Sequence, residues 1–230
     1  HVMSPRFNFL DYDHNLKYTG FDVNHNQCII MTSKVNKSER TNMKVSKTQV
    51  KENRDKIVEK ATQLFRSKGY DGVGIAELMS SAGFTHGGFY KHFSSKTDLV
   101  TITAKYGLEQ VLKRIEGLNL TQFIQMYVSR THRDNRDQGC TLTALSCDAA
   151  RQPDEVKVEF EEGIEQLIEF IMNERAKQVS LETEELRKQA INILAQSVGA
   201  IALSRACPDQ SNLSDEILES CRESLLKLTD

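Results

Sequence analysis

The sequence predicts an all-α protein in which a small N-terminal domain of short helices precedes a larger helical domain. Two observations favour this fold class. Apolar residues recur at helical spacing from about residue 51 onward, and no segment shows the sustained apolar-polar alternation of a half-buried strand. Pro153 and Pro208 fall between helical stretches, where proline is tolerated.

Residues 1–45 differ from the rest of the chain. They are rich in Asn, Asp, Thr, Lys and Ser, and their few apolar residues show no period, so we expect a largely disordered tail. Because Met43 stands just before the regular part, residues 1–42 are interpreted as an upstream extension, with a functional arm as the alternative.

Three short helices are expected next. The first ends at Gly69, because a glycine commonly terminates a helix, and the second covers about 75–81 and is closed by Gly83. The third begins after Thr85, whose hydroxyl suits an N-cap, and ends near His92. The apolar face of the first helix consists of Ile57, Ala61, Leu64 and Phe65.

Ser95 and Asp98 have the S-x-x-D spacing of a capping box, which predicts the start of a long fourth helix. Its apolar positions are Leu99, Ile102, Tyr106, Val111, Leu112 and Ile115. Further helices are predicted at about 119–131, 140–151, 154–176, 183–206 and 213–228.

Short helices after a basic leader, with a glycine turn between the second and third, are typical of a helix-turn-helix DNA-binding unit. Residues 43–100 carry ten Lys/Arg against six Asp/Glu, whereas 101–230 carry fifteen against twenty-two, so the N-terminal part suits an anionic partner. An ordinary αα-corner is the alternative. In this unit the residues expected to face inward or to form the turn are Leu78, Met79, Ala82, Gly83, Phe84, Phe89 and Phe93.

Two stretches, "FRSKGYDGVGIAELMSSAGF" (65–84) and "GFYKHFSSKTDLV" (88–100), resemble the TetR/AcrR family of transcriptional regulators. The resemblance implies a DNA-binding domain over 46–97 and an effector-binding and dimerisation domain over 98–230. It also implies that the recognition helix in the major groove begins with Thr85, His86, Gly87 and Gly88. Because the two glycines reduce side-chain readout, base reading is expected to rest on Thr85, His86 and Lys91. The residues that it assigns to phosphates are Tyr90, His92 and Lys96.

Catalytic and metal sites are not expected. His86-Gly87-Gly88 resembles an esterase oxyanion turn, but no serine of the chain stands in G-x-S-x-G, and no phosphate-cradling G-x-x-x-x-G-K-[ST] is present. His86 and His92 would lie about 240° apart around a helix and cannot share a metal. His132 is interpreted as a solvated or locally bonded histidine. We therefore expect neither an enzyme nor a cofactor.

A dimer is expected, since one helix-turn-helix reads little DNA. The helix at 183–206 carries small residues at i, i+4, i+7 and i+11, which would let a partner helix approach closely. These residues are Ala195, Gly199, Ala202 and Ala206, and the last helix adds Ile217, Cys221, Leu225 and Leu228. Packing within one chain is the alternative.

A pocket for an uncharged, moderately apolar effector is expected among the helices from about 99 to 195, although the same residues could be plain core. The candidate lining residues are Tyr106, Phe123, Tyr127, Leu142, Leu145, Phe160, Ile164, Leu167 and Met172.

Cys140 follows Gly139 at a predicted helix start, and Arg133 and Arg136 are close in sequence, which would favour the thiolate. Cys147 is expected on the same face, two turns away. "GCTLTALSCDAA" resembles the Gly-Cys helix of TetR members that sense electrophiles or oxidants. The alternative is a buried structural thiol.

The sequence thus predicts a homodimeric repressor that binds a palindromic double-stranded operator and is released by a small-molecule effector. Five cysteines without CxxC spacing and no apolar run near the ~18 residues of a membrane span favour the cytoplasm and no membrane partner. A helical enzyme and a protein-interaction module without DNA binding are the rival functions.

Overall fold

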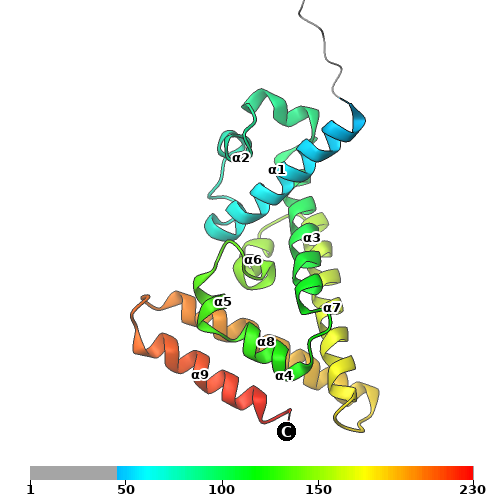
Figure 1. Ribbon diagram of the computed structural model, residues 1–230, viewed down its shortest axis with the longest axis vertical. Helices are drawn as coiled ribbons and strands as arrows, with labels where there is room; N and C mark the ends of the chain where they lie inside the picture. Colours follow the sequence, from blue (N-terminus) through cyan, green and yellow to red (C-terminus); the bar gives the residue numbers. More distant parts are fainter. Residues whose placement is uncertain (1–45, 230) are drawn as a thin grey trace, which may run out of the picture. The chain divides into compact units, whose positions relative to one another are not determined.

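A computed structural model describes residues 46–229, and the predicted tail of residues 1–45 lies outside the described residues. The described part is all-helical, as predicted, without a β-strand (Figure 1). The helices α1, α2 and η1 lie at one end of this part, and α4, α8 and α9 lie toward the other. No helix among the described residues is long and apolar enough to cross a membrane.

Helix α1 (Lys47–Lys68) begins one turn earlier than predicted. Ser46 caps it, since its hydroxyl accepts a hydrogen bond from the Gln49 amide at 3.1 Å. It ends at Gly69, whose φ of 77° is in the left-handed region that glycine tolerates. Ile57, Ala61, Val58 and Phe65 are buried on its inner face, while Leu64 is only partly buried.

Helix α2 (Ile75–Ser81) has the predicted bounds and is followed by Gly83 with a φ of 84°. The third element, η1 (His86–Lys91), is a 3-10 helix. Thr85 makes no side-chain cap, so that expectation was wrong; its carbonyl accepts from the Gly88 amide at 2.9 Å. Two glycines in six residues give little helix propensity, which favours this short, tight form.

Helix α3 (Lys96–Ile115) starts where the capping box predicted, but only half of the box forms. The Ser95 hydroxyl accepts from the Asp98 amide at 3.0 Å. The Asp98 carboxylate accepts from the amide and hydroxyl of Ser94 instead of the Ser95 amide.

The predicted helix at 119–131 was wrong as a single element. Helix α4 (Leu120–Tyr127) ends at Val128, whose ψ of 69° is not helical, and α5 (Arg130–Asp134) begins with a Ser129 cap on the His132 amide. The remaining helices agree with their predicted ranges to within two residues and are α6 (Thr141–Ala149), α7 (Asp154–Ala176), α8 (Thr183–Ala206) and α9 (Asn212–Leu226).

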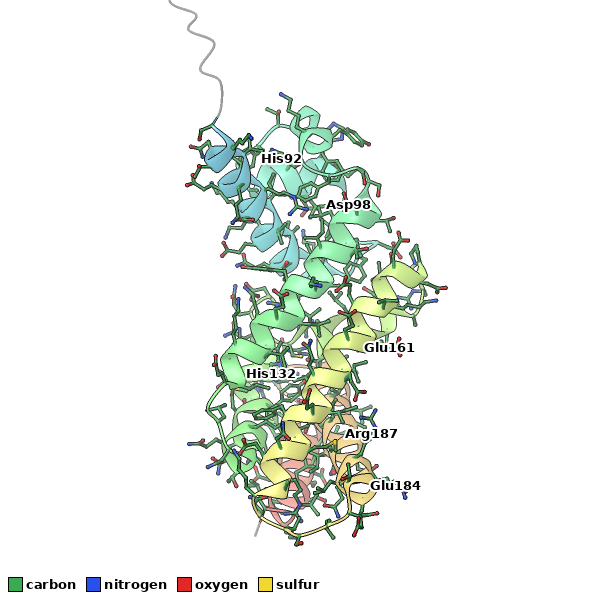
Figure 2. The ribbon with its side chains drawn as sticks, turned by 90° about the vertical axis from the view of Figure 1, so that its right-hand side faces the viewer. His92, Asp98, His132, Glu161, Glu184 and Arg187 are labelled. Carbon is green, nitrogen blue, oxygen red and sulfur yellow. The ribbon has the colours of Figure 1, made fainter. Side chains whose placement is uncertain are left out.

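One core runs through the described part. In Figure 2, α3 and α7 lie side by side along its length, and α8 packs extensively on both α7 and α9. The core includes residues of α1, α2 and η1 as well as of α3, α4 and α6 to α9, so the DNA-binding unit shares buried contacts with the rest.

Candidate nucleic-acid interface and effector cavity

The helix-turn-helix unit stands on a fully buried apolar base. Leu78, Met79 and Phe89 are inaccessible to solvent, and the Phe89 and Phe93 rings lie 5.4 Å apart. These contacts hold η1 against α1 and α2, as the sequence predicted. Phe84 is only partly buried, so it closes the unit less completely than expected.

The opposite side of η1 faces solvent. Tyr90 is 68% exposed although its ring leans on Phe89 at 5.2 Å, which directs the hydroxyl outward. A side chain at Gly87 would meet nothing within 4 Å, so the backbone there is open to a close partner. Of the predicted base-reading residues, Gly88 is half-buried and the others, Thr85, His86, Gly87 and Lys91, are exposed.

His92 and Lys96, the predicted phosphate contacts, are both half-buried. Burial, Arg54 and Lys91 lower the pKa of His92, which favours its neutral form. Its Nδ1 atom is buried and has no partner among the described residues. Lys96 donates from Nζ to the Tyr70 carbonyl at 2.6 Å. Both residues therefore offer less free charge to a phosphate than the sequence suggested.

Two cations of α1 were missed as candidates. Arg54 lies 5.3 Å over the Phe93 ring, and Lys56 lies 5.8 Å over the Phe84 ring. Their packing on aromatic residues of the helix-turn-helix unit places positive charge beside η1. The signal in the sequence was the basic side of the first helix.

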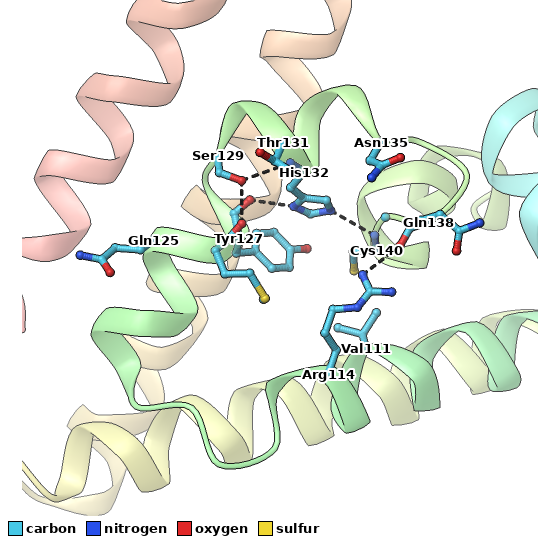
Figure 3. Close-up of a pocket in the computed structure, with 12 residues that line it drawn as sticks. Val111, Arg114, Gln125, Tyr127, Ser129, Thr131, His132, Asn135, Gln138 and Cys140 are labelled. Atoms are coloured by element: carbon cyan, nitrogen blue, oxygen red, sulfur yellow. Dashed lines mark hydrogen bonds between the residues drawn. The ribbon is translucent and has the colours of Figure 1, made fainter.

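A cavity of about 460 Å³ lies between the end of α3, α4, α5 and the loop before α6 (Figure 3). Its lining consists of Val111, Arg114, Gln125, Met126, Tyr127, Ser129, Thr131, His132, Asn135, Gln138, Gly139 and Cys140.

Only Tyr127 and Cys140 of the predicted pocket residues line this cavity. Phe123 is buried core against Phe170 at 5.5 Å. Tyr106 and Leu145 pack against the core, and Cys147 is exposed. Phe160 and Ile164 line a separate groove of about 500 Å³ along α6, α7 and Arg187 of α8. The polar lining of the first cavity was missed because α5 and its flanking turns were not predicted.

His132 joins the end of α4 to the start of α6, so its interpretation as locally bonded is confirmed. Its Nε2 atom accepts from the Cys140 amide at 3.0 Å, so Nδ1 carries the hydrogen and donates to the Tyr127 carbonyl at 2.7 Å. Burial lowers the pKa of His132 to about 4, helped by Arg205 and Arg114 and opposed by the carbonyl bond. The ring is therefore neutral near pH 7.

Cys140 is the N-cap residue of α6 and is only 2% exposed. The expected neighbour Arg133 points away from it and binds the end of α8, because the turn at α5 redirects its side chain. Burial lowers the pKa values of Arg66 and Arg205, and the Cys140 thiol opposes this shift in both. Burial, followed by the Cys140 thiol, raises the pKa of the Tyr127 hydroxyl well above its ordinary value.

Arg66, near the end of α1, joins the helix-turn-helix unit to the cavity wall. Its Nε donates to the Thr141 hydroxyl at 3.0 Å and its Nη1 to the Asp137 carbonyl at 3.3 Å. Nη2 donates to the Gly107 carbonyl at 3.2 Å and to the Gln110 side chain at 3.0 Å. A Cβ at Gly107 would lie 2.2 Å from the Thr141 hydroxyl, so this approach requires glycine.

The family model described as "Bacterial regulatory proteins, tetR family" matches residues 57–101, which contain this helix-turn-helix unit. Residues 57–101 therefore match the helix-turn-helix region of TetR-family regulators. This family consists of DNA-binding transcriptional regulators and not of enzymes. The finding supports DNA binding over a protein-interaction module that lacks it.

The curated relatives are also helix-turn-helix regulators. YvdT of Bacillus subtilis is 35% identical over 63 residues, which is 27% of this chain and 32% of YvdT. A regulator of the lacX 3' region of Lactococcus lactis is 26% identical over 170 residues, covering 68% of this chain and 85% of the relative. The chain spans about a third of the length of YvdT.

Solved structures, among them one described as a TetR-family regulator, share the fold. Reduced NemR of E. coli aligns with a TM-score of 0.63 at 19% identity, over 76% of this chain and 96% of NemR. A regulator from Agrobacterium tumefaciens aligns with a TM-score of 0.64 at 19% identity, over 79% and 100%. AibR, solved with isovaleryl coenzyme A and operator DNA, aligns with a TM-score of 0.53 at 14% identity, over 75% of this chain and 97% of AibR.

The small-residue stripe of this chain is open to solvent on α8. Ala195, Ala202 and Ala206 are exposed, and a side chain at Gly199 would meet nothing within 4 Å. Leu203 beside them is 60% exposed. These residues remain available to a partner helix.

The α9 half of the predicted interface is placed differently. Leu225 is fully buried within the chain, and Ile217 and Cys221 are partly buried against the same core. The apolar positions of α9 that face the core are shifted by one residue from the apolar positions that face solvent. The exposed apolar residues of this part are Leu213 and Leu228.

Proposed function

We propose that this chain is a homodimeric, cytoplasmic repressor of the TetR family that binds a palindromic operator and releases it when a small molecule occupies the cavity described above. The observation that carries the proposal is the exposed Thr85–Lys91 segment on a buried aromatic base. Rigid support with an open outer face suits insertion into a major groove. The residues assigned to phosphates remain Tyr90, His92 and Lys96, supplemented by Arg54 and Lys56 of α1.

The dimer is proposed to form through the exposed small residues of α8. Two α8 helices can approach closely there, and the outer side of α9 with Leu213 would complete a four-helix contact. Two reading units then meet two operator half-sites. In this proposal 46–97 is the DNA-binding domain and 98–230 is the sensing and dimerisation domain.

Arg66 supplies a physical route from the cavity to DNA. The loop that it holds, from Asp137 to Thr141, includes the cavity residues Gln138, Gly139 and Cys140. A second contact joins the Tyr70 amide to the Asp148 carboxylate of α6 at 3.2 Å. A ligand that displaces the loop would shift α1, and it needs only to bind the released state more tightly than the DNA-bound state. AibR offers a related fold that holds both ligand and operator.

Selection of genomic DNA by the purified protein tests the DNA-binding part. The expected result is a salt-sensitive preference for one palindromic site over random duplex. Lys91→Gln should weaken binding about fivefold or more, because one cationic contact is lost. The matched control Lys113→Gln, an exposed lysine of α3, should bind as the wild type does. Equal affinity for selected and random DNA would contradict the proposal.

A cysteine sensor is the second candidate, because the Cys140 thiol lies in the cavity wall beside Tyr127. In this version the thiolate adds to the double bond of an electrophile, forming a carbon-sulfur bond, and a proton from water goes to the neighbouring carbon. A small maleimide should release operator from wild-type protein and from Cys147→Ser but not from Cys140→Ser. Release from the Cys140→Ser variant would exclude this mechanism.

A further inference from the structure

We propose that the cavity between α3, α4 and α5 accepts a small organic anion, with its acid group on Arg114 and its apolar body against Val111 and Met126. This inference rests on the proposed effector role of the cavity and names the chemical class of the ligand. It replaces the uncharged effector expected from the sequence.

The cavity has a size typical of small-molecule sites, and its lining carries positive but no negative charge. About 460 Å³ falls within the usual range of roughly 300–1,000 Å³. Arg114 is the one charged side chain of the lining in the described part of the chain, since His132 is neutral. The other polar groups are amides and hydroxyls, so an acid meets no carboxylate there.

Positive charge also surrounds the cavity. Arg114 contributes to the lowered pKa of Arg66, and Arg205 and Arg114 both lower the pKa of His132. Among the described residues none of these three arginines forms an ion pair with a carboxylate. Arg114 instead donates from Nη1 to the Gln138 carbonyl at 2.8 Å. Asp137, next to the cavity residue Gln138 in sequence, accepts from the Gln138 side-chain Nε2 at 3.2 Å and does not line the cavity.

The remaining donors of Arg114 are suited to an acid group, because a guanidinium fork matches a carboxylate in geometry and charge. Figure 3 shows Arg114 extending from α3 and Tyr127 from α4, both toward Cys140. The Tyr127 hydroxyl is buried and has no hydrogen-bond partner among the described residues. A bound ligand that carries an acceptor would satisfy it.

His132 is not available as a ligand group. Both of its ring nitrogens are engaged, one with the Tyr127 carbonyl and one with the Cys140 amide. The histidine therefore shapes the cavity wall, while Arg114 and Tyr127 provide the unengaged donors.

Three probes with one apolar body and different heads test the charge preference, namely 3-phenylpropanoate, 3-phenylpropanamide and 3-phenylpropan-1-amine. Binding to the full chain is measured by calorimetry and by thermal shift. The acid is expected to bind at least about tenfold more tightly than the amide or the amine, a difference of about 1.4 kcal/mol. Arg114→Gln should abolish this preference, and Arg114→Lys should restore part of it.

The matched control is Lys113→Gln, which removes the same charge from the neighbouring exposed position of α3 and should keep the preference for the acid. An acid that binds no more tightly than the amide, including the case in which none of the probes binds, overturns the inference. So does a preference that survives in Arg114→Gln.

Operator binding is measured on the same samples. If the acid binds through Arg114 but leaves operator affinity unchanged, the proposed regulation fails while the anion site stands. If the protein binds operator and an amine releases it, the anion inference fails while the proposed regulatory function stands.

Discussion

Two buried arginines hold this molecule together in different ways. Arg66 is 5% exposed and binds only neutral acceptors, which are the Thr141 hydroxyl, the Gln110 side chain and two backbone carbonyls. Arg133 is 2% exposed and binds the carboxylates of Asp134 at 2.7 Å and Asp209 at 3.1 Å, together with the carbonyls of Ser204 and Cys207.

This difference in acceptors distinguishes two sides of the cavity: a fixed side held by Arg133 and an adjustable side held by Arg66. Arg133 attaches α5 to the end of α8, and Arg205 adds bonds to the Arg133 carbonyl at 2.9 Å and the His132 carbonyl at 2.7 Å. Arg66 attaches α1 to the loop on the other side. Contacts without a carboxylate can be exchanged at lower cost, because no ion pair has to be separated. Movement is therefore expected on the side that leads to the DNA-binding unit.

Arg133→Met should have the largest effect on stability. Loss of its donors leaves the Ser204 and Cys207 carbonyls without these partners, and we expect the free energy of unfolding to fall by about 3 kcal/mol. Urea unfolding followed by circular dichroism measures this change. A fall below about 1 kcal/mol would show that α5 is not fixed to α8 by this residue.

Arg66→Met should lower the free energy of unfolding less, by about 2 kcal/mol, because its acceptors are neutral and partly satisfied elsewhere. Its distinguishing effect is local. Amide hydrogen exchange at the end of α1 and in the loop before α6 should become faster, as measured by mass spectrometry. If Arg133→Met accelerated amide exchange in the same two segments, the distinction between the fixed and the adjustable side of the cavity would be contradicted.

Acid should weaken the fixed side through His132. Its pKa falls from an ordinary 6.5 to about 4 in the folded protein, so between these values the unfolded chain binds a proton that the folded chain does not. The free energy of unfolding should therefore decrease as pH falls from 6.5 toward 4, by at most about 1.4 kcal/mol per pH unit.

The histidine contribution is the difference between the wild type and His132→Gln. Urea unfolding at pH 7 and pH 5 should show a smaller loss on acidification in the variant. An equal loss in the two proteins would mean that groups other than His132 cause the pH dependence.

Tyr90→Phe should have the smallest effect and should change neither side of the cavity. Removal of the exposed hydroxyl should reduce operator affinity about fivefold, or about 1 kcal/mol, with little change in stability. Fluorescence anisotropy with labelled operator measures the affinity. A marked loss of thermal stability would mean that the ring has a packing role that its exposure does not suggest.

Local signals predicted the helix-turn-helix unit well. Glycines at 69 and 83 adopt the left-handed backbone that ends α1 and separates α2 from η1, and the aromatic residues at 89 and 93 are core as expected. The shape of η1 was not predicted, because a helical pattern over six residues does not distinguish a 3-10 from an α-helix. The break after Tyr127 was missed because no proline or glycine marks it.

The cavity was harder to predict because its decisive contacts join residues distant in sequence. Arg66 meets acceptors 41 to 75 positions away, and Arg133, besides its neighbour Asp134, meets acceptors 71 to 76 positions away. Helical periodicity shows which side of a helix is apolar but not which other helix covers it. Leu225 illustrates this limit, since it has the spacing of an interface residue and lies in the core.

Operator affinity measured across a salt series, with selected operator and scrambled duplex of equal length, tests most directly whether η1 reads DNA sequence. We expect selected operator to bind at least about a thousandfold more tightly than scrambled duplex at physiological salt, with a steep salt dependence for both. Lys91→Gln should reduce this affinity ratio, while Lys113→Gln should preserve it. Equal affinity for the two duplexes, or a ratio insensitive to Lys91→Gln, would contradict a reading surface at η1.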